Sequence, residues 1–188
     1  MSSFTHRNPN GPRKQRGQSL TEWVIYVALA AIVLAAIFVY FNRSRHEQQA
    51  NSAASNLIAM DVAVVKQWGQ DPNGFANVTA AAIVNNGDAP SAMIQGGNLV
   101  SDFGTPITVA PATTYNANDS IAYSTLVPVA DCSNLVQAVA KSFTTITVAG
   151  TAVKNVAGGV PTISNTTLGT QCASTNGAQV PVVFTATR

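Results

Sequence analysis

Glycine and proline are absent from the 51 residues between Gln18 and Trp68. Since these two residues interrupt or end helices, their absence predicts one continuous helix of about 75 Å. Charge is also absent from the 19 residues Trp23–Phe41, which are apolar on every side of the helix. Nineteen helical residues span about 28 Å, close to the hydrocarbon thickness of a bilayer. This half of the helix is therefore suited to lipid or to the core of a helix bundle.

Histidines, basic clusters and glycine-rich phosphate loops are lacking beyond residue 70. Without a histidine, residues 71–188 offer no base for a serine or cysteine nucleophile and no sound zinc site. A domain that binds nucleic acid would need a basic stripe, and none is present. Asp88, Asp102 and Asp119 are scattered, as turn or cap residues would be, rather than gathered for calcium. We therefore expect no enzyme activity, no cofactor, no metal and no nucleic-acid partner.

Acidic residues are missing from the first 17 residues, which carry four basic ones: Arg7, Arg13, Lys14 and Arg16. This polar segment has nothing to bury and looks like a leader. A basic head before an apolar helix is typical of a cytoplasmic N-terminus, which would place the residues after 42 outside the cytoplasm. Arg43, Arg45 and His46 on the far side weaken this charge asymmetry.

The second half of the helix, residues 42–70, is amphipathic. Apolar residues recur there at three- and four-residue steps, with two more widening the stripe: Ala53, Leu57, Met60, Val64 and Trp68, then Ile58 and Val65. This stripe predicts a face that packs on a sheet or on other helices. Trp68 fits a core position better than a contact between subunits. Gly69 and the turn-forming sequence Asp71–Gly74 then end the helix.

Residues 71–188 have the pattern of a mixed domain with an antiparallel sheet, which makes the chain α+β in class. Helical segments are expected at 78–86, at 90–95 and from about residue 131 or 133 to about 142. Strands are expected at 106–110, 120–127, 144–148, 151–154 and 180–187, the third and fourth forming a hairpin. Asp131 or Ser133 could cap the last helix. A loop is expected to carry Cys172. Pro181 indicates that the last strand either lies at the edge of the sheet or begins near this residue.

Only two cysteines are present, Cys132 and Cys172, and they lie 40 residues apart. In an oxidising compartment an even count favours one disulfide, and the spacing is too long for a redox CxxC motif. Such a bridge would contribute about 4 kcal/mol to stability in the chain-entropy model. Two separate buried thiols are the alternative.

The junction between the basic head and the apolar helix reads RGQSLTE, from Arg16 to Glu22. Ser19–Glu22 is by itself a good capping box. Together, however, the basic residues, Gly17, a glutamate at the fifth place after it and the apolar run resemble the type IV pilins. The 17-residue leader, Gln18 as the first mature residue and a helix without proline resemble the type IVb branch.

The domain also resembles this branch, in particular the major pilins of thin, conjugation-associated pili, in the segments Ala82–Ile94, Cys132–Leu135 and Thr145–Val153. The resemblance implies a type IV pilin fold, in which a long N-terminal helix packs on an antiparallel sheet domain with a C-terminal disulfide loop. It implies three regions: a leader, 1–17; a helix, 18–70; and a globular domain, 71–188. The helix would consist of an apolar half, 18–41, and an amphipathic half, 42–70.

The resemblance further implies that a prepilin peptidase cleaves between Gly17 and Gln18 and methylates the new amine. Glu22 would then be neutralised by the N-terminal amine of a neighbouring subunit. The chain would be held in the lipid of the bacterial inner membrane and polymerised there by the pilus assembly platform. The product would be a homo-oligomeric helical filament on the cell surface, with roles of the adhesion or conjugation kind.

Two other functions remain open at this stage. The chain could be a minor pilin or a type II secretion pseudopilin in the same kind of machinery, and the sequence GQSLTEW also resembles the tight-adherence pilins. Composition alone also leaves open a protein of another class, a signal-anchored periplasmic binding domain. An ordinary secretory signal fits less well, because its apolar core would be shorter and a small-residue cleavage site would follow it.

Overall fold

The computed structural model describes residues 20–173 and 177–188. Its first element is the helix α1, Leu20–Trp68, which runs for 49 residues without a break. The chain forms two compact units, and the boundary between them falls within α1, between Asn42 and Arg43. The continuous helix predicted from the absence of glycine and proline is thus confirmed over the described residues.

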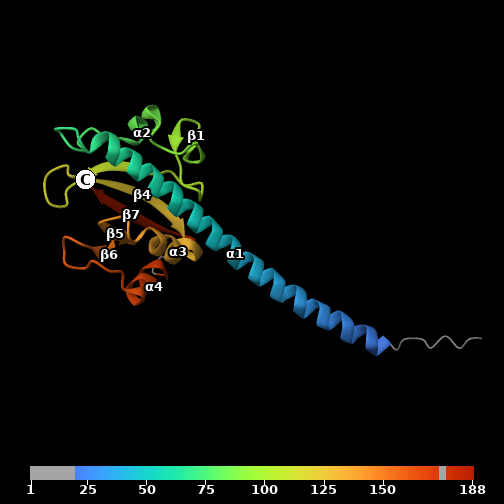
Figure 1. Ribbon diagram of the computed structural model, residues 1–188. Coiled ribbons are helices and arrows are strands. Elements are labelled where there is room, and N and C mark those ends of the chain that lie inside the picture. Colours follow the sequence, from blue (N-terminus) through green and yellow to red (C-terminus); the bar gives the residue numbers. More distant parts are fainter. Residues whose placement is uncertain (1–19, 174–176) are drawn as a thin grey trace, which may run out of the picture. The chain divides into compact units, whose positions relative to one another are not determined.

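The second unit is built on a five-stranded antiparallel sheet with the strand order β3-β4-β7-β5-β6 (Figure 1). Its strands are β3, Thr108–Ala112; β4, Ser120–Pro128; β5, Thr145–Val148; β6, Thr151–Asn155; and β7, Gln179–Thr187. The predicted β4 and the predicted β5–β6 hairpin are confirmed. Strand β3 begins two residues later than expected, because Pro106 forms only an isolated bridge with Val100 before the ladder starts.

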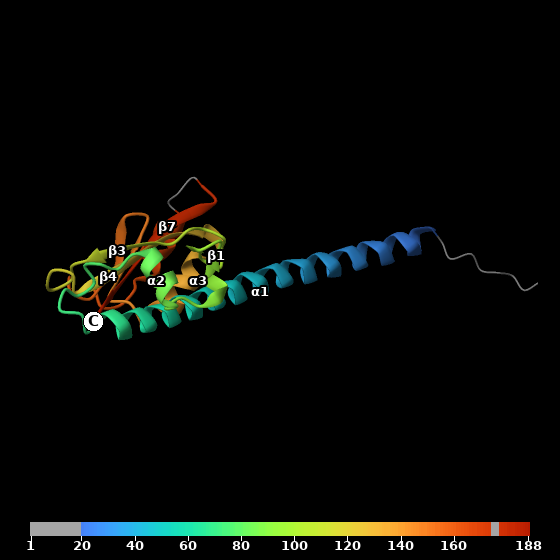
Figure 2. The same cartoon turned by 90° about the horizontal axis from the view of Figure 1, so that it is seen from above.

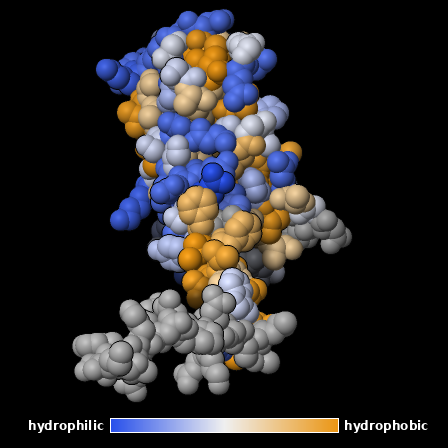
Figure 3. Space-filling view, turned by 90° about the vertical axis from the view of Figure 1, so that its right-hand side faces the viewer, coloured by the Kyte–Doolittle hydropathy of each residue, from blue (hydrophilic) through white to orange (hydrophobic). Residues whose placement is uncertain are grey.

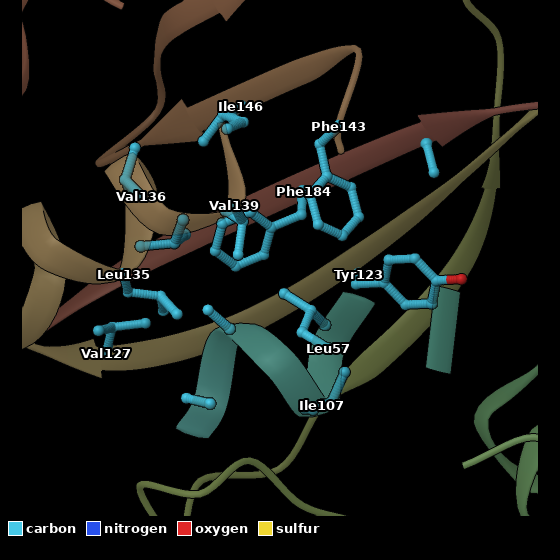
Figure 4. Packing of buried hydrophobic residues seen from close by; sticks show 14 of the residues in the cluster. Leu57, Ile107, Tyr123, Val127, Leu135, Val136, Val139, Phe143, Ile146 and Phe184 are labelled. Atoms are coloured by element: carbon cyan, nitrogen blue, oxygen red, sulfur yellow. The ribbon is translucent and has the colours of Figure 1, made fainter. Parts of the chain in front are cut away.

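One face of the sheet is covered by the second half of α1 and by α3, Val129–Val139, and the core lies between these layers. Figure 4 shows Leu57 of α1 among side chains from the sheet and from α3. The predicted α1 stripe is confirmed, since Ala53, Leu57, Met60 and Val64 are buried. Trp68 and its neighbours Ile58 and Val65 pack against the same core from partly buried positions.

Helix α3 begins earlier than predicted and without the expected cap. Its first residue is Val129, and the preceding Pro128 makes no side-chain cap bond. Proline fixes φ near the helical value, so it can start a helix without a capping side chain. Asp131 lies in the first turn and Ser133 lies inside the helix, so the prediction that either residue caps it was wrong. The predicted inward-facing residues of α3 are buried, as are the nearby cysteines: Leu135, Val136, Val139, Cys132 and Cys172.

Cys172 lies on a helix, α4, Asn165–Ala173, where the sequence predicted a loop. This helix is weakly marked in sequence because it is rich in threonine and contains Gly169, which are poor helix formers. Its buried residues, Leu168 and Cys172, hold it against α3 and the β5–β6 hairpin. Tertiary contacts therefore stabilise a segment that local propensity disfavours.

Strand β7 is the central strand, so the edge position considered for Pro181 was wrong and the strand-start position was right. Val182 is the residue that pairs with Val148, the end of β5, so Pro181 lies just past the β5 ladder. Its carbonyl accepts a hydrogen bond from the N–H of Ala149 on that side. Proline has no backbone N–H. At Pro181 that N–H would point toward β5 but lie beyond the last β5–β7 pair, so its absence costs no hydrogen bond of the ladder.

A small cluster beside the sheet contains the remaining elements: α2, Ala80–Asn86; the 3-10 helix η1, Ser91–Met93; and β1 with β2, Ile94–Gln95 and Asn98–Leu99 (Figure 2). Helices were predicted at 78–86 and 90–95. The second prediction is confirmed for Ser91–Met93 and was wrong for residues 94 and 95, which pair as β1 with β2. Thr79 caps α2 by accepting a hydrogen bond from the Ala82 N–H, and Gly87 ends it with a φ of 76°. A left-handed residue at this place favours glycine, which bears no Cβ.

Candidate functional site

The apolar first half of α1 is the largest exposed hydrophobic feature of the described residues. Fourteen large side chains of Trp23–Phe41 are between 56% and 78% exposed within the single chain. The space-filling view shows orange, apolar residues along this part of the helix (Figure 3). Among the described helices, α1 alone is long and apolar enough to cross a membrane. This surface is far larger than a soluble monomer normally exposes, so it marks a contact with lipid or protein.

Glu22 lies in the first turn of α1, at the entrance to this apolar surface, and it is exposed in the single chain. A carboxylate near a helix N-terminus is stabilised by the helix dipole. Gly17 and Gln18, the predicted processing residues, lie outside the described residues.

The disulfide expected from the cysteine count is present and joins Cys132 on α3 to Cys172 on α4. The loop it closes spans 40 residues and contains the whole β5–β6 hairpin. Both cysteines are buried, so the bridge fixes two helices against the sheet rather than offering reactive sulfur.

A side-chain contact next to this disulfide has no signal in the sequence. Nδ1 of His46 on α1 lies 2.9 Å from Oδ1 of Asp131, the residue before Cys132. The Asp131 side chain is 2% exposed, whereas that of His46 is 47% exposed. This contact ties α1 to the start of α3. The two residues are 85 positions apart, so no local pattern could reveal it.

Another carboxylate of α1, Asp61, faces the sheet. It accepts a 3.1 Å hydrogen bond from the hydroxyl of Tyr123, whose ring is fully buried on β4. Burial raises the pKa of Asp61 from 3.8 to about 6, although the Tyr123 hydrogen bond lowers it in part. Burial, followed by the negative charge of Asp61, raises the pKa of Tyr123, which keeps its hydroxyl protonated as the donor.

Lys154 on β6 is a buried cation that closes the end of α3. Its Nζ donates hydrogen bonds of 2.6 Å to the carbonyl oxygens of Ala140 and Phe143. These carbonyls follow the last turn of α3, where the negative end of the helix dipole favours a cation. Burial lowers the pKa of Lys154. No sequence pattern indicates this role, since a lysine in a hairpin strand is normally exposed.

Of the three aspartates considered for turns and caps, Asp119 holds a turn, whereas the Asp102 carboxylate binds a side chain of α1. The Asp119 carboxylate accepts hydrogen bonds from the N–H groups of Thr114, Tyr115 and Asn116. Burial raises the pKa of Asp119, but these bonds and one from the Ser120 hydroxyl outweigh it and hold the pKa well below its usual range. Asp102 accepts two bonds from Asn56, and the Asp88 N–H closes the end of α2. The described residues contain no cluster suited to a metal ion.

A family model described as PilS N terminal matches residues 47–187. The chain belongs to the PilS N-terminal family. The match covers most of the amphipathic half of α1 and nearly all of the domain that packs on it. A search of curated proteins found no significant match.

Solved structures with the same fold as this PilS-family chain include two pilins. TcpA, a type IV pilin from Vibrio cholerae El Tor biotype, has a TM-score of 0.57 and 20% identity, covering 74% of this chain and 99% of TcpA. The type IVb pilin from Salmonella typhi has a TM-score of 0.55 and 18% identity, covering 71% of this chain and 96% of that pilin. The predicted type IV pilin fold is thereby confirmed, with its long helix, antiparallel sheet and C-terminal disulfide. The chain is a type IV pilin-like structural subunit.

Proposed function

We propose that this chain is the subunit of a type IVb-like pilus and that it polymerises through the apolar half of α1. The observation that carries the proposal is the exposed apolar surface of Trp23–Phe41 on a chain of the pilin fold. Burying a large apolar side chain contributes about 1.5 to 3 kcal/mol, so fourteen of them represent more than 20 kcal/mol. Lipid and a bundle of identical helices both satisfy such a surface. The same segment can therefore hold the subunit in the membrane before assembly and pack against its own copies in the filament.

In this proposal a prepilin peptidase cleaves behind Gly17 on the cytoplasmic side and methylates the amine of Gln18. The prepilin lies in the bacterial inner membrane before the assembly platform adds it to an extracellular filament. Glu22 then pairs with the N-terminal amine of a neighbouring subunit. A carboxylate in a low-dielectric helix bundle needs such an opposite charge to remain ionised.

The two alternatives differ from this proposal in processing and in abundance. A minor pilin or secretion pseudopilin would be processed in the same way but would be rare in filaments. A signal-anchored periplasmic binding domain would keep its anchor and stay in the membrane fraction.

Mass spectrometry of the exported protein tests the proposal directly. We expect an N-terminus at methylated Gln18 and a high abundance of the chain in filaments sheared from the cell surface. An intact Met1 in the membrane fraction would refute the processing step. Correct processing with only trace amounts in sheared filaments would instead identify a minor subunit.

The role of Glu22 is tested by Glu22→Ala. We expect cleavage to remain largely intact and filament yield to fall sharply, because the neighbouring amine loses its partner. The chain has one other glutamate, Glu47, which is exposed on the second half of α1 and provides the matched control Glu47→Ala. Normal filaments from Glu22→Ala, or equal loss from both variants, would contradict the charge pairing.

A further inference from the structure

The outer face of the sheet carries a row of polar groups at one end. Thr145 on β5 pairs in register with Thr185 on β7 and with Asn155 on β6. Ile146 and Phe184, which follow and precede the two threonines, are fully buried in the core. Because side chains alternate along a strand, both threonines point to the opposite, outer face. The three residues therefore lie side by side on adjacent strands, about 4.8 Å apart.

These groups have hydrogen-bonding capacity that the described part of the chain leaves unused. The hydroxyls of Thr145 and Thr185 have no partner among the described residues, and both residues are only partly buried. Oδ1 of Asn155 accepts a 2.8 Å hydrogen bond from the Gly158 N–H, which fixes the carboxamide and leaves its NH₂ group as a donor. Two hydroxyls and an amide donor thus form a row.

Two loops stand on either side of this row and enclose a trough of about 420 Å³. It is lined by eight residues: Ala112, Thr113, Thr114, Thr145, Asn155, Ala157, Gly158 and Thr185. None of them is charged. Anionic ligands such as phosphates and nucleic acids would find no cation here, and a cationic ligand would find no carboxylate.

Both loops are held in place by their own hydrogen bonds. On one side, Asp119 binds three consecutive N–H groups, beginning with that of Thr114, and the hydroxyl oxygens of Thr114 and Ser120 lie within hydrogen-bond distance at 2.6 Å. On the other side, Asn155 and Val160 exchange two backbone hydrogen bonds. A Cβ on Gly158 would lie 2.6 Å from Nδ2 of Asn155, so glycine leaves room for the carboxamide. The shape of the trough is therefore preorganised, which lowers the entropic cost of binding.

We propose that this trough binds an uncharged carbohydrate. Neighbouring hydroxyls on a sugar ring lie a few ångströms apart, so a ring can hydrogen-bond to successive members of the row while its other face meets Ala112 and Ala157. Tyr115 follows the wall residue Thr114 and is 60% exposed. Among the described residues from 43 to 188 it is the one exposed Phe, Tyr or Trp. Its amphipathic ring suits the C–H groups of a sugar. This site goes beyond the proposed role in filament structure.

The test is a titration of the full chain with neutral methyl glycosides of glucose, galactose and N-acetylglucosamine. The chain is held in a phosphocholine detergent, whose head group is not a sugar. Amide NMR shifts are followed at Thr145, Thr185 and Asn155. We expect saturable shifts at millimolar concentration with at least one glycoside. Glucose 6-phosphate serves as the charged counterpart of methyl glucoside.

The double variant Thr145→Val with Thr185→Val removes both hydroxyls and keeps the β-branched shape. We expect its affinity for the glycoside to fall by about tenfold or more, as loss of neutral hydrogen bonds would produce. Thr147→Val is the control, because Thr147 lies on the same strand and face but does not line the trough. Filament yield should be unchanged in both variants, which separates this proposal from the proposed function. If no glycoside shifts these amides, if glucose 6-phosphate binds more tightly than methyl glucoside, or if Thr147→Val loses as much affinity as the double variant, the proposal is overturned.

Discussion

Acidification should stabilise the fold of the second unit through Asp61. The folded-state pKa of this carboxyl is raised from 3.8 to about 6, so the folded chain binds its proton more tightly than the unfolded chain does. The stabilising effect of that proton is complete below pH 3.8 and is lost as the pH rises through about 6. One pKa unit corresponds to about 1.4 kcal/mol, so the contribution of Asp61 is about 3 kcal/mol.

The perturbation that isolates this effect is Asp61→Asn. An amide is neutral at every pH, and its carbonyl oxygen can still accept the hydrogen bond from Tyr123. We therefore expect the variant to be more stable than the wild type by about 3 kcal/mol at pH 7, and the two proteins to converge near pH 4. Because both proteins keep every other ionisable group, the difference between them reports Asp61.

The measurement is urea unfolding of the full chain in detergent between pH 4 and pH 7, with the disulfide intact, followed by near-ultraviolet circular dichroism. The slope of the unfolding free energy against denaturant should stay the same in both proteins. Glu47→Gln removes an exposed carboxyl from the same helix and should not reproduce the gain at pH 7. Parallel pH curves for the wild type and Asp61→Asn, or a variant less stable at pH 7, would refute the reasoning.

Two further predictions concern the stability of the same unit. Replacing Cys132 and Cys172 together by serine should lower the unfolding free energy by about 4 kcal/mol, as expected for a 40-residue loop; an unchanged urea midpoint would contradict it. Lys154→Met should cost about 2 to 3 kcal/mol, because the carbonyls of Ala140 and Phe143 lose a charged donor in a buried site. Thermal unfolding measures this loss, and a melting temperature equal to that of the wild type would show that Lys154 is not needed there.

The parts of the fold that are written in local patterns could be predicted from the sequence. The absence of glycine and proline predicted α1, and the three- and four-residue spacing of Leu57, Met60 and Val64 predicted its buried face. Strand-like runs on both sides of the turn Ala149–Gly150 predicted the β5–β6 hairpin. In each case the signal and the structure it produces lie within a few residues of each other, so local reasoning is sufficient.

The features that were missed depend on contacts between distant segments. Helix α4 has poor helix formers and exists because Leu168 and Cys172 are buried. The position of β7 between β4 and β5 is a matter of topology, which the pattern of a single strand does not contain. The same holds for the pairs His46–Asp131 and Asp61–Tyr123, whose members lie far apart in the sequence.

The central place of β7 also dictates the order in which the sheet can form. Strands β4 and β5 do not pair with each other, and each depends on β7, the last strand in chain order. The two halves of the sheet, β3–β4 and β5–β6, can form early as local hairpins, but they remain separate until Gln179–Thr187 joins them. Pairings between such distant segments form slowly. Because β7 residues such as Phe184 pack in the same core as Leu57 of α1, that core cannot close before the last strand has joined the sheet.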